Sequence, residues 1–321
     1  MRFYRPLKLI SIIQRTGFQP HDFTIVGEQD AEVLGLDDYQ VALPGDITWV
    51  DFESLYNKAF KSDASVVIIN SMPKDYPNDK TIVIVDDPKS FFDSVASCVF
   101  EEQFPPRGFI SRIFNPKDKV IGKNCKIDRS VKIGSHVHIG DNVTIEPFVV
   151  IHDNVFIGDN VIIRSHCDIG GHPFSHTKQQ DGTYVPRNSW GNTIILDDAD
   201  LAPMTNIDRG ITGSTIIGSG TKTCAMCQIG HDTWIGRNGY ICSGVTIAGY
   251  VRIGNDCQFW GQAGVSSSVH IADDTNVEAC AMVLKDVKQP GQSLAGFPAE
   301  PKQTHWKRAA IIRKMASEYE Q

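Results

Sequence analysis

Isoleucine recurs every six residues between Ile121 and Ile169, and this period is the strongest pattern in the chain. Most of these isoleucines follow a small or β-branched residue two positions earlier, as Ile139 follows Val137. Residues two apart on a strand face the same side, so each pair predicts one short inward-facing strand. Gly, Asn and Asp fill the intervals and suit turns. A fixed short period of this kind is typical of a solenoid.

The same six-residue frame returns after an interruption and runs from Ile217 to Val283, with Thr223 as its one polar member. The alternating strands of a β-sandwich would instead place turns about every 8–12 residues. The pattern therefore predicts a mainly β protein built around a left-handed parallel β-helix of hexapeptide repeats. The left hand is an attribute of that class, because the general rule for parallel crossovers gives the opposite hand.

Residues before the first repeats lack this period and carry the pattern of a small α/β domain. Two apolar runs, at 64–69 and 81–85, predict buried strands, and Leu7–Ile13 predicts a helix. Asp87 before Pro88 predicts a helix start, because a capping acid and a first-turn proline both favour one. We expect three parts: an N-terminal α/β domain over 1–106, a β-helix over 107–290 with a loop insertion at 171–192, and a C-terminal helical tail over 291–321.

Composition narrows the function classes. The 321 residues carry a formal net charge of -7, which argues against general nucleic-acid binding. No apolar run approaches the roughly 20 residues of a transmembrane helix. Gln14 and Arg15 break the apolar patch near the start, so we do not expect a signal peptide. The eight cysteines are scattered apart from the Cys224–Cys227 pair, and we expect a reduced, cytoplasmic protein.

The C-terminal tail is basic, although the chain as a whole is acidic. Its segment 302–314 contains basic residues and no acidic one. Such a patch attracts an acidic partner, although a solvated helix face would look the same. The basic residues are Lys302, Lys307, Arg308, Arg313 and Lys314.

The insertion at 171–192 interrupts the repeat with Gly, Pro and polar residues. A loop that leaves a solenoid adds nothing to the core and is usually functional. It contains His172, Phe174 and His176, and a metal site from the two histidines is a weak alternative. The six-residue frame then returns at Ile195, and an insertion of four residues interrupts it again before Ile217.

Two further pairs have two interpretations each. Asp208 and Arg209 suit recognition of a polar or phosphate group, or they pair with each other. Trp49 and Tyr56, in the N-terminal domain, suit a sandwich around a base or sugar, or they pack in the core.

His231 is the candidate for chemistry. Three hexapeptides make one coil of 18 residues, so residues 18 apart stack at roughly 4.8 Å. Gly249 lies one coil after His231, and Ser267 lies two coils after it with Ser268 beside it. A base next to a bare backbone amide is what acyl transfer needs, to take a proton and to hold an oxyanion. A structural or solvated histidine is the alternative.

These features together resemble the UDP-3-O-acylglucosamine N-acyltransferases of lipid A biosynthesis. The resemblance covers nearly the whole chain. Its motifs are the Gly-Asp-Ile-Thr-aromatic stretch ending at Trp49, Thr-x-Ile-Asp-Arg-Gly at Thr205–Gly210, Gln-Ile-x-His at Gln228–His231, the exit beginning at Gly296-Phe297-Pro298, and the Trp306 helix.

The resemblance implies a homotrimer with sites between neighbouring β-helices, an acyl carrier protein as donor of a 3-hydroxyacyl chain, and the 2-amine of a UDP-linked glucosamine as acceptor. It implies a nucleotide-sugar-binding N-terminal domain, and no cofactor or metal. His231 then matches the general base and Gly249 the oxyanion amide. The remaining matched positions are Trp49 and Tyr56 for the uracil, Met282 for the limit of the acyl chain, and Phe174, Asp208, Arg209, Gln228 and Ser268 for substrate contacts. The basic tail would meet the carrier protein.

The chain departs from the family around the expected site. Cys224-Ala225 replaces Asp-Asn, Ser268 replaces a second histidine, and the loop keeps only Phe174 of its usual motif. These changes leave three alternatives: another acyl donor or nucleotide-sugar acceptor, a non-catalytic paralogue that binds a sugar nucleotide or carrier protein, and a zinc enzyme of the γ carbonic anhydrase type.

Overall fold

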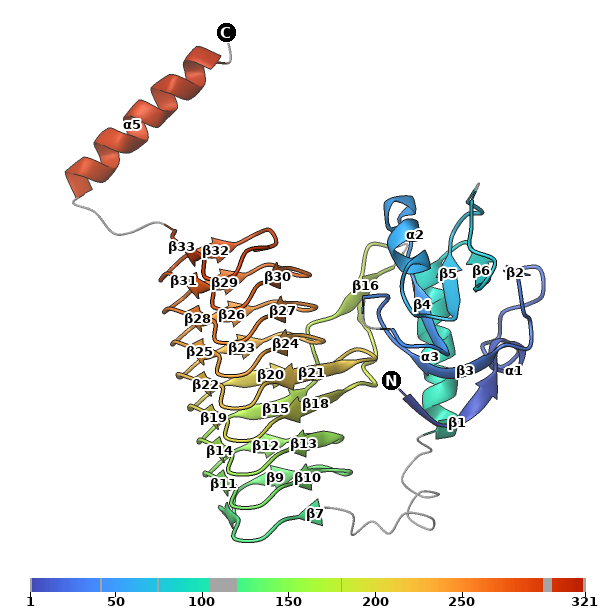
Figure 1. Cartoon of the computed structure of the whole chain (residues 1–321), viewed down its shortest axis with the longest axis horizontal. Helices are drawn as coiled ribbons and strands as arrows, with labels where there is room; N and C mark the ends of the chain where they lie inside the picture. Colours follow the sequence, from blue (N-terminus) through green and yellow to red (C-terminus); the bar gives the residue numbers. More distant parts are fainter. Residues whose placement is uncertain are drawn as a thin grey trace.

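Three parallel sheets wind into a β-helix, and an α/β head domain lies beside it (Figure 1). This computed structural model describes residues 2–40, 42–73, 75–103, 120–179, 181–296 and 302–319. The predicted parallel β-helix, N-terminal α/β domain and C-terminal helix are confirmed. The predicted domain boundary at Pro105-Pro106 and most of the exit motif, from Phe297 to Pro301, lie outside the described residues.

The head domain contains one six-stranded sheet in the order β1-β3-β4-β5-β6-β2. Its inner strands pair in parallel, while β1 and β2 pair antiparallel at the two edges. The elements are β1 (Arg2–Lys8), α1 (Leu9–Ile13), β2 (Phe23–Val26), β3 (Glu32–Leu36), β4 (Asp46–Trp49), α2 (Glu53–Phe60), β5 (Val66–Ile69), β6 (Thr81–Val85) and α3 (Pro88–Gln103).

Two boundaries test the expectations for this domain. The start of α3 is as predicted, since Asp87 Oδ1 accepts a hydrogen bond from the Ser90 amide at 3.0 Å. The first helix begins at Leu9 rather than Leu7, because the preceding residues form β1 and pair with β3. An edge strand ahead of that helix was not predicted.

The β-helix has three faces, named here after their first strands. The β7 sheet contains β7 (Val120–Ile121), β10 (His138–Ile139), β13 (Val155–Ile157), β18 (Asn192–Ile195), β21 (Ser214–Ile217), β24 (Trp234–Ile235), β27 (Arg252–Ile253) and β30 (His270–Ile271). The β8 sheet contains β8 (Lys126–Ile127), β11 (Thr144–Ile145), β14 (Ile162–Ile163), β19 (Asp200–Leu201), β22 (Lys222–Thr223), β25 (Tyr240–Ile241), β28 (Gln258–Phe259), β31 (Asn276–Val277) and β33 (Ser293–Leu294). The β9 sheet contains β9 (Lys132–Ile133), β12 (Val150–Ile151), β15 (Asp168–Gly171), β20 (Asn206–Asp208), β23 (Gln228–Ile229), β26 (Thr246–Ile247), β29 (Gly264–Val265) and β32 (Met282–Val283).

The register confirms the 18-residue coil. Ile229 pairs with Ile247 and Ile247 with Val265, each 18 residues on. Ile157 pairs with Ile195 across 38 residues, and Ile195 with Ile217 across 22. The excesses over one coil, 38 − 18 = 20 and 22 − 18 = 4, are the two predicted insertions.

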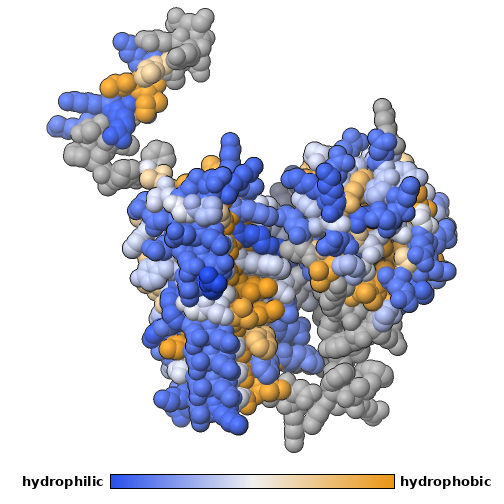
Figure 2. Space-filling view, viewed as in Figure 1, coloured by the Kyte–Doolittle hydropathy of each residue, from blue (hydrophilic) through white to orange (hydrophobic). Residues whose placement is uncertain are grey.

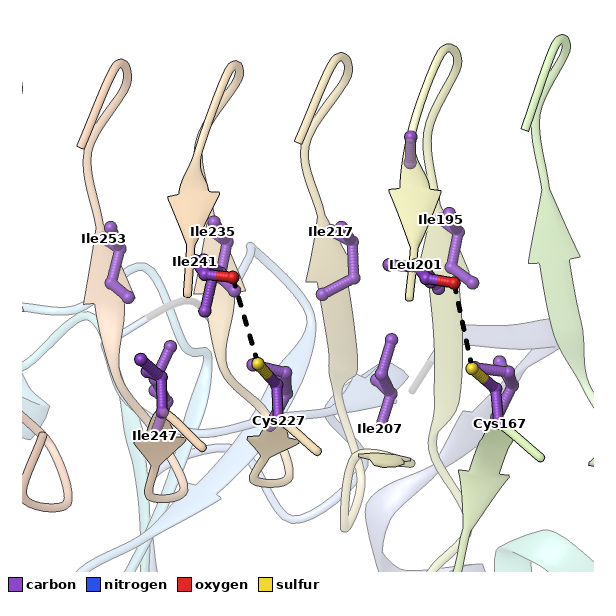
Figure 3. Packing of buried hydrophobic residues seen from close by; sticks show 14 of the residues in the cluster. Cys167, Ile195, Leu201, Ile207, Ile217, Cys227, Ile235, Ile241, Ile247 and Ile253 are labelled. Carbon is purple, nitrogen blue, oxygen red and sulfur yellow. Dashed lines mark hydrogen bonds between the residues drawn. The ribbon is translucent and has the colours of Figure 1, made fainter. Parts of the chain in front are cut away.

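The inward residues of the frame form one continuous buried core (Figure 3). The inward thiols behave as small hydrophobic groups whose S–H reaches main-chain oxygens. Cys167 lies 3.9 Å from the carbonyl oxygen of Leu201, and Cys227 lies 4.0 Å from that of Ile241. Burial raises the pKa of both thiols to about 11, so they stay protonated at neutral pH.

Thr223 is accommodated in this core by hydrogen bonds. Its Oγ1 accepts from the Ala202 amide at 3.1 Å and lies 3.1 Å from the hydroxyl of Thr205. We expect the isosteric Thr223→Val variant to be destabilised by about 0.5–1.5 kcal/mol, because the hydrogen bonds of the Thr223 hydroxyl are lost. Urea unfolding measures this effect, with Thr144→Val on the outer side of the same sheet as control. Equal midpoints for the two variants would contradict the assignment.

Side-chain caps stack along the corners of the β-helix. At the corner after the β7 sheet, the amide of Asp141 donates to Asp159 Oδ1 of the next coil at 2.7 Å, and the amide of Asn255 donates to Asp273 Oδ1 at 2.8 Å. The corner after the β9 sheet starts in the same way, with the Ser135 amide donating to Asp153 Oδ1. Asn and Asp therefore serve at these turns as caps for the preceding coil.

The insertion at 171–192 connects the β-helix to the head domain. It contains a short hairpin of β16 (His176–Lys178) and β17 (Tyr184–Pro186), and Figure 1 shows it extending toward the head. Arg187 forms a hydrogen-bonded ion pair with Asp93 of α3, and Trp190 packs into the hydrophobic core of the head. The loop therefore fixes the head beside one corner of the β-helix.

The C-terminal helix α5 spans Lys302–Tyr319 and confirms the predicted helical tail. Among the described residues, no helix combines the length and the hydrophobicity needed to cross a bilayer.

Candidate active site

The predicted site residues gather at the corner where the chain leaves the β9 sheet for the β7 sheet. Both insertions leave the β-helix at this corner, after β15 and after β20. His231 follows β23 at the same corner, and Gly249 follows β26 one coil later. The local reason is the period of the repeat, which returns the chain to this corner every 18 residues.

A cavity of about 530 Å³ lies on the outer side of the β9 sheet next to this corner. It brings six predicted residues together: Phe174, Asp208, Gln228, His231, Gly249 and Met282. The other lining residues are His172, Asn206, Gly230, Thr246, Ile247, Ala248, Val265 and Ser267. The size suits part of a small-molecule substrate.

His231 is held by the carboxylate that follows it. Its Nδ1 lies 3.0 Å from Asp232 Oδ2. Asp232 is buried and also accepts hydrogen bonds from the amides of Ile211, at 2.7 Å, and Gly213, at 3.1 Å. These amides come from the four-residue insertion, which therefore serves to fix the carboxylate. A carboxylate on Nδ1 favours the tautomer whose Nε2 is free to accept a proton.

Gly249 lies directly against the imidazole. A Cβ atom added there would come within 2.7 Å of both Cε1 and Nε2 of His231. A side chain at this position would occupy the place of the ring. Glycine is therefore required by close approach, not by an unusual backbone conformation, since its φ is outside the left-handed region.

The caps that close other turns are missing here. His231, Gly249 and Ser267 occupy the corner position at which Asp153 caps the Ser135 amide. Among the described residues, the amide of Gly249 donates no hydrogen bond, while its carbonyl accepts from Ser268 at 3.1 Å. The loss of the Asx cap leaves an unpaired N–H beside the imidazole, which is a suitable oxyanion donor.

Tyr250 supports the imidazole from the other side. Its ring meets His231 edge-on, with centroids 5.0 Å apart, and its amide donates to the His231 carbonyl at 2.9 Å. Burial raises the pKa of Tyr250 well above its usual value, so the phenol is neutral. Packing from both sides restricts the orientation of the base.

Asp208 and Gln228 supply polar groups to the cavity, whereas Arg209 does not line it. Asn206 Nδ2 donates to Asp208 Oδ1 at 3.2 Å and to Gln228 Oε1 at 2.6 Å. Burial raises the pKa of Asp208, although hydrogen bonding and the nearby His231 oppose this. Arg209 donates through Nε to the Gly170 carbonyl at 2.8 Å and braces the base of the loop. Asp208 and Arg209 therefore do not pair with each other, since Asp208 bonds to Asn206 and Arg209 bonds to Gly170.

Phe174 and Met282 line the cavity with exposed apolar surface. Phe174, on the insertion, is 92% exposed, and Met282, on β32, is 62% exposed. The thioether of Met282 lies over Gly264, where an added Cβ would come within 2.5 Å of its Cε. Ser268 does not line the cavity; its neighbour Ser267 does.

The two head-domain aromatics are not presented as a facing pair. Trp49 is half-buried and packs near Phe92, with ring centroids 6.3 Å apart. Tyr56 lies in a different hydrophobic cluster, and its hydroxyl bonds to Asn70 and lies 3.1 Å from Ser71 Oγ. In this conformation Tyr56 is a core residue, and the uracil assignment of both aromatics stays a prediction.

The remaining predicted residues lie away from the cavity. Lys307, Arg308, Arg313 and Lys314 are exposed on α5, and Lys302 is its first residue. Cys224 is exposed at another corner, where the hydroxyl of Ser243 donates to its sulfur at 2.9 Å and lowers its pKa. Within the described ranges no three His, Cys, Asp or Glu side chains converge on a metal site.

The site residues that were not predicted include Asp232, Asn206, Tyr250, and His172 as a lining residue. Asp232 directly follows His231 in the sequence, which was an available signal for a His–Asp pair. Strand alternation would point the two side chains to opposite sides. Asp232 has a φ of 55°, and this turn brings its carboxylate back to the imidazole.

Comparisons with known proteins support the fold and the class of enzyme. Residues 118–152 match the model for the bacterial transferase hexapeptide, six repeats. The UDP-3-O-acylglucosamine N-acyltransferase of Janthinobacterium sp. (strain Marseille) is 34% identical over 131 residues, which are 41% of this chain and 37% of that protein. The protein of the same name from Methylorubrum extorquens (strain PA1) is 33% identical over 135 residues, 42% of this chain and 38% of that protein.

The matched segments span less than half the length of these curated relatives. A solved UDP-N-acetylglucosamine acyltransferase from Bacteroides fragilis 9343 covers 53% of this chain and 65% of its own, at 21% identity and a TM-score of 0.49. The resemblance drawn from the motifs is confirmed by the two curated relatives.

Proposed function

We propose that this protein is an N-acyltransferase that moves a 3-hydroxyacyl chain from acyl carrier protein to the 2-amine of a UDP-3-O-acylglucosamine. The observation that carries the proposal is the contact between His231 and Gly249 inside the 530 Å³ cavity. The names of the curated relatives support the substrate class.

The arrangement supports a direct transfer without a covalent enzyme intermediate. His231 Nε2 takes a proton from the acceptor amine as the nitrogen attacks the thioester carbonyl. The Gly249 amide donates to the oxygen that becomes negative in the tetrahedral intermediate. The intermediate then collapses, and the imidazolium returns its proton to the departing thiolate. Asp232 stabilises the imidazolium through Nδ1.

The remaining surfaces suit the proposed substrates. Asp208 and Gln228 offer hydrogen bonds to the sugar, and Phe174 and Met282 offer apolar contacts to an acyl chain. The basic face of α5 would meet the acidic carrier protein, because opposite charge favours encounter. No cofactor enters the proposal, and the cytoplasm, where acyl carrier proteins work, is the proposed location.

A homotrimer completes the proposal. Figure 2 shows a strip of hydrophobic surface along the β-helix on the side of the head domain. Phe156 and Trp234, on the outer side of the β7 sheet, are among the exposed apolar residues. Exposed apolar strips of this kind mark interaction surfaces, and in this proposal neighbouring copies of the chain cover it.

The test is a transfer assay read by mass spectrometry. Purified protein is combined with UDP-3-O-acylglucosamine and 3-hydroxyacyl carrier proteins of several chain lengths. A product that gains one acyl group on nitrogen supports the proposal. If the folded protein gives no product with any of these donors, but does so with acyl-coenzyme A or another UDP-amino sugar, the substrate assignment is wrong. If it gives none at all, the binding paralogue remains.

Removal of Met282 is expected to change the preferred chain length. In Met282→Ala the cavity gains room for about two methylenes, each contributing roughly 0.8 kcal/mol when buried. The ratio of kcat/KM values for a longer chain over the wild-type preference should rise by about tenfold. Met226→Ala, an exposed methionine at another corner, is the matched control. An unchanged ratio would remove Met282 from the acyl site.

A further inference from the structure

The head domain reaches the catalytic corner through the segment between β3 and β4. Asp37 Oδ1 lies against Gly213, where an added Cβ would be 2.7 Å from it. Gln40 Oε1 lies 2.8 Å from Nε2 of His270 on β30. Asp38, between them, interacts electrostatically with Asp232 and with Arg252 of β27. The contact therefore places two carboxylates of the head behind the His231–Asp232 pair.

Arg252 is the cation at the centre of this contact. Its guanidinium stacks over the Trp234 ring, 4.5 Å from the centroid, and its Nη1 donates to the main-chain oxygen of Asp232. It does not bond to the Asp232 carboxylate, whose oxygens receive His231 and the amides of Ile211 and Gly213. The guanidinium is partly buried, and the carboxylates that act on it are Asp232 first, then Asp38 and Asp37 of the head.

We propose that Asp38 is a positioning residue from the head domain, which balances Arg252 and so keeps the Asp232 carboxylate available to His231. This inference rests on the proposed role of His231 as base. Without Asp38, the positive charge of Arg252 acts on Asp232 alone, and the imidazolium becomes harder to form. The position of the head domain would then affect how readily His231 of the β-helix takes up a proton.

The electrostatics of the contact give the coupling a pH range. Burial raises the pKa of Asp38 to about 6, and Asp232 and Asp37 raise it while Arg252 lowers it. The balancing charge therefore develops as the pH rises through about 6. The ionisable groups around the His231–Asp232 pair are, on the head, Asp37 and Asp38; on the loop, Arg187 and His172; and on the β-helix, Asp208, Tyr250, Arg252 and His270.

The raised pKa also has a cost in stability. A carboxyl with a folded pKa above its unfolded value binds more protons when folded, so stability falls as the pH rises from about 4 to about 6. We expect Asp38→Asn to melt above wild type at pH 8 and not at pH 4. A buried charge that lowers stability is what a functional role predicts, since function and stability are often in conflict at such sites.

The test follows the His231 imidazole directly by NMR, using ¹³C-labelled histidine in the full chain with His231→Ala to assign the signal. In Asp38→Asn the protonation midpoint should move down by roughly 0.5–1 pH unit, and in Arg252→Gln it should move up by a similar amount. Arg252→Lys should restore the wild-type midpoint, because it keeps the charge. Asp63→Asn, an exposed head carboxylate, is the control.

Opposite shifts in the two variants support the proposal, and a merely structural role would not produce them. Unchanged midpoints, or shifts in one direction for both, would overturn it. The NMR readout needs no substrate, so this result stands apart from the transfer assay. If the transfer assay succeeds, the acid side of the kcat/KM profile should move in the same directions.

Discussion

Replacement of His231 by alanine is expected to reduce kcat by roughly 10²–10⁴-fold while the fold persists. The imidazole lies against Gly249 and can take the proton from the amine, and Asp232 holds it in the tautomer that does so. The loss should fall on kcat more than on KM, because the proton transfer belongs to the transition state. Single-turnover transfer from the acyl carrier protein measures it.

The control is His21→Ala, an exposed histidine of the head domain. Thermal melting and gel filtration should not distinguish it from wild type, and its activity should be unchanged. Asp232→Asn should reduce kcat less than His231→Ala, since the base remains but loses its partner. Turnover within threefold of wild type in His231→Ala would show that another group, such as Asp208 of the cavity lining, takes the proton.

The core was predictable because its rule is local and repeated. A residue such as Ile229 recurs in a frame of six, and three frames return the chain to the same corner. The 18-residue coil then converts distance along the chain into distance in space, which is how Gly249 was placed beside His231 from the sequence. The loss of the side-chain caps at this corner is also visible in the sequence. The Asp found at position 153 does not recur at the equivalent positions Gly249 and Ser267.

The site residues that the sequence did not predict depend on contacts that do not follow the repeat. Asp232 was missed because strand alternation places neighbours on opposite sides, and a turn with φ of 55° does not obey it. The position of Tyr56 relative to Trp49 could not be predicted from their spacing in the sequence. It depends on which face of the sheet the helix with Tyr56 packs against. Asp38 and Arg252 meet only through the docking of two domains, and no sequence spacing encodes that contact.

Substitution of Gly249 by alanine is expected to abolish most turnover without unfolding the protein. The added Cβ would lie 2.7 Å from Cε1 and Nε2 of His231, and the movable partner is the end of a side chain rather than backbone. The imidazole therefore swings away, while the coil keeps its register. Displacement of a catalytic group by about 1 Å costs on the order of 10²-fold, so we expect kcat to fall at least that far.

Gly261→Ala is the matched control, because its added Cβ would meet nothing nearer than the Ser243 carbonyl at 3.6 Å. Both glycines have φ outside the left-handed region, so neither substitution strains the backbone. Equal melting temperatures with a large difference in kcat would assign the loss to the displaced base. If Gly249→Ala retains wild-type turnover, the close approach of glycine to the imidazole is not needed for the reaction. The chemistry would then have to use the cavity without the His231–Gly249 contact on which the proposed function rests.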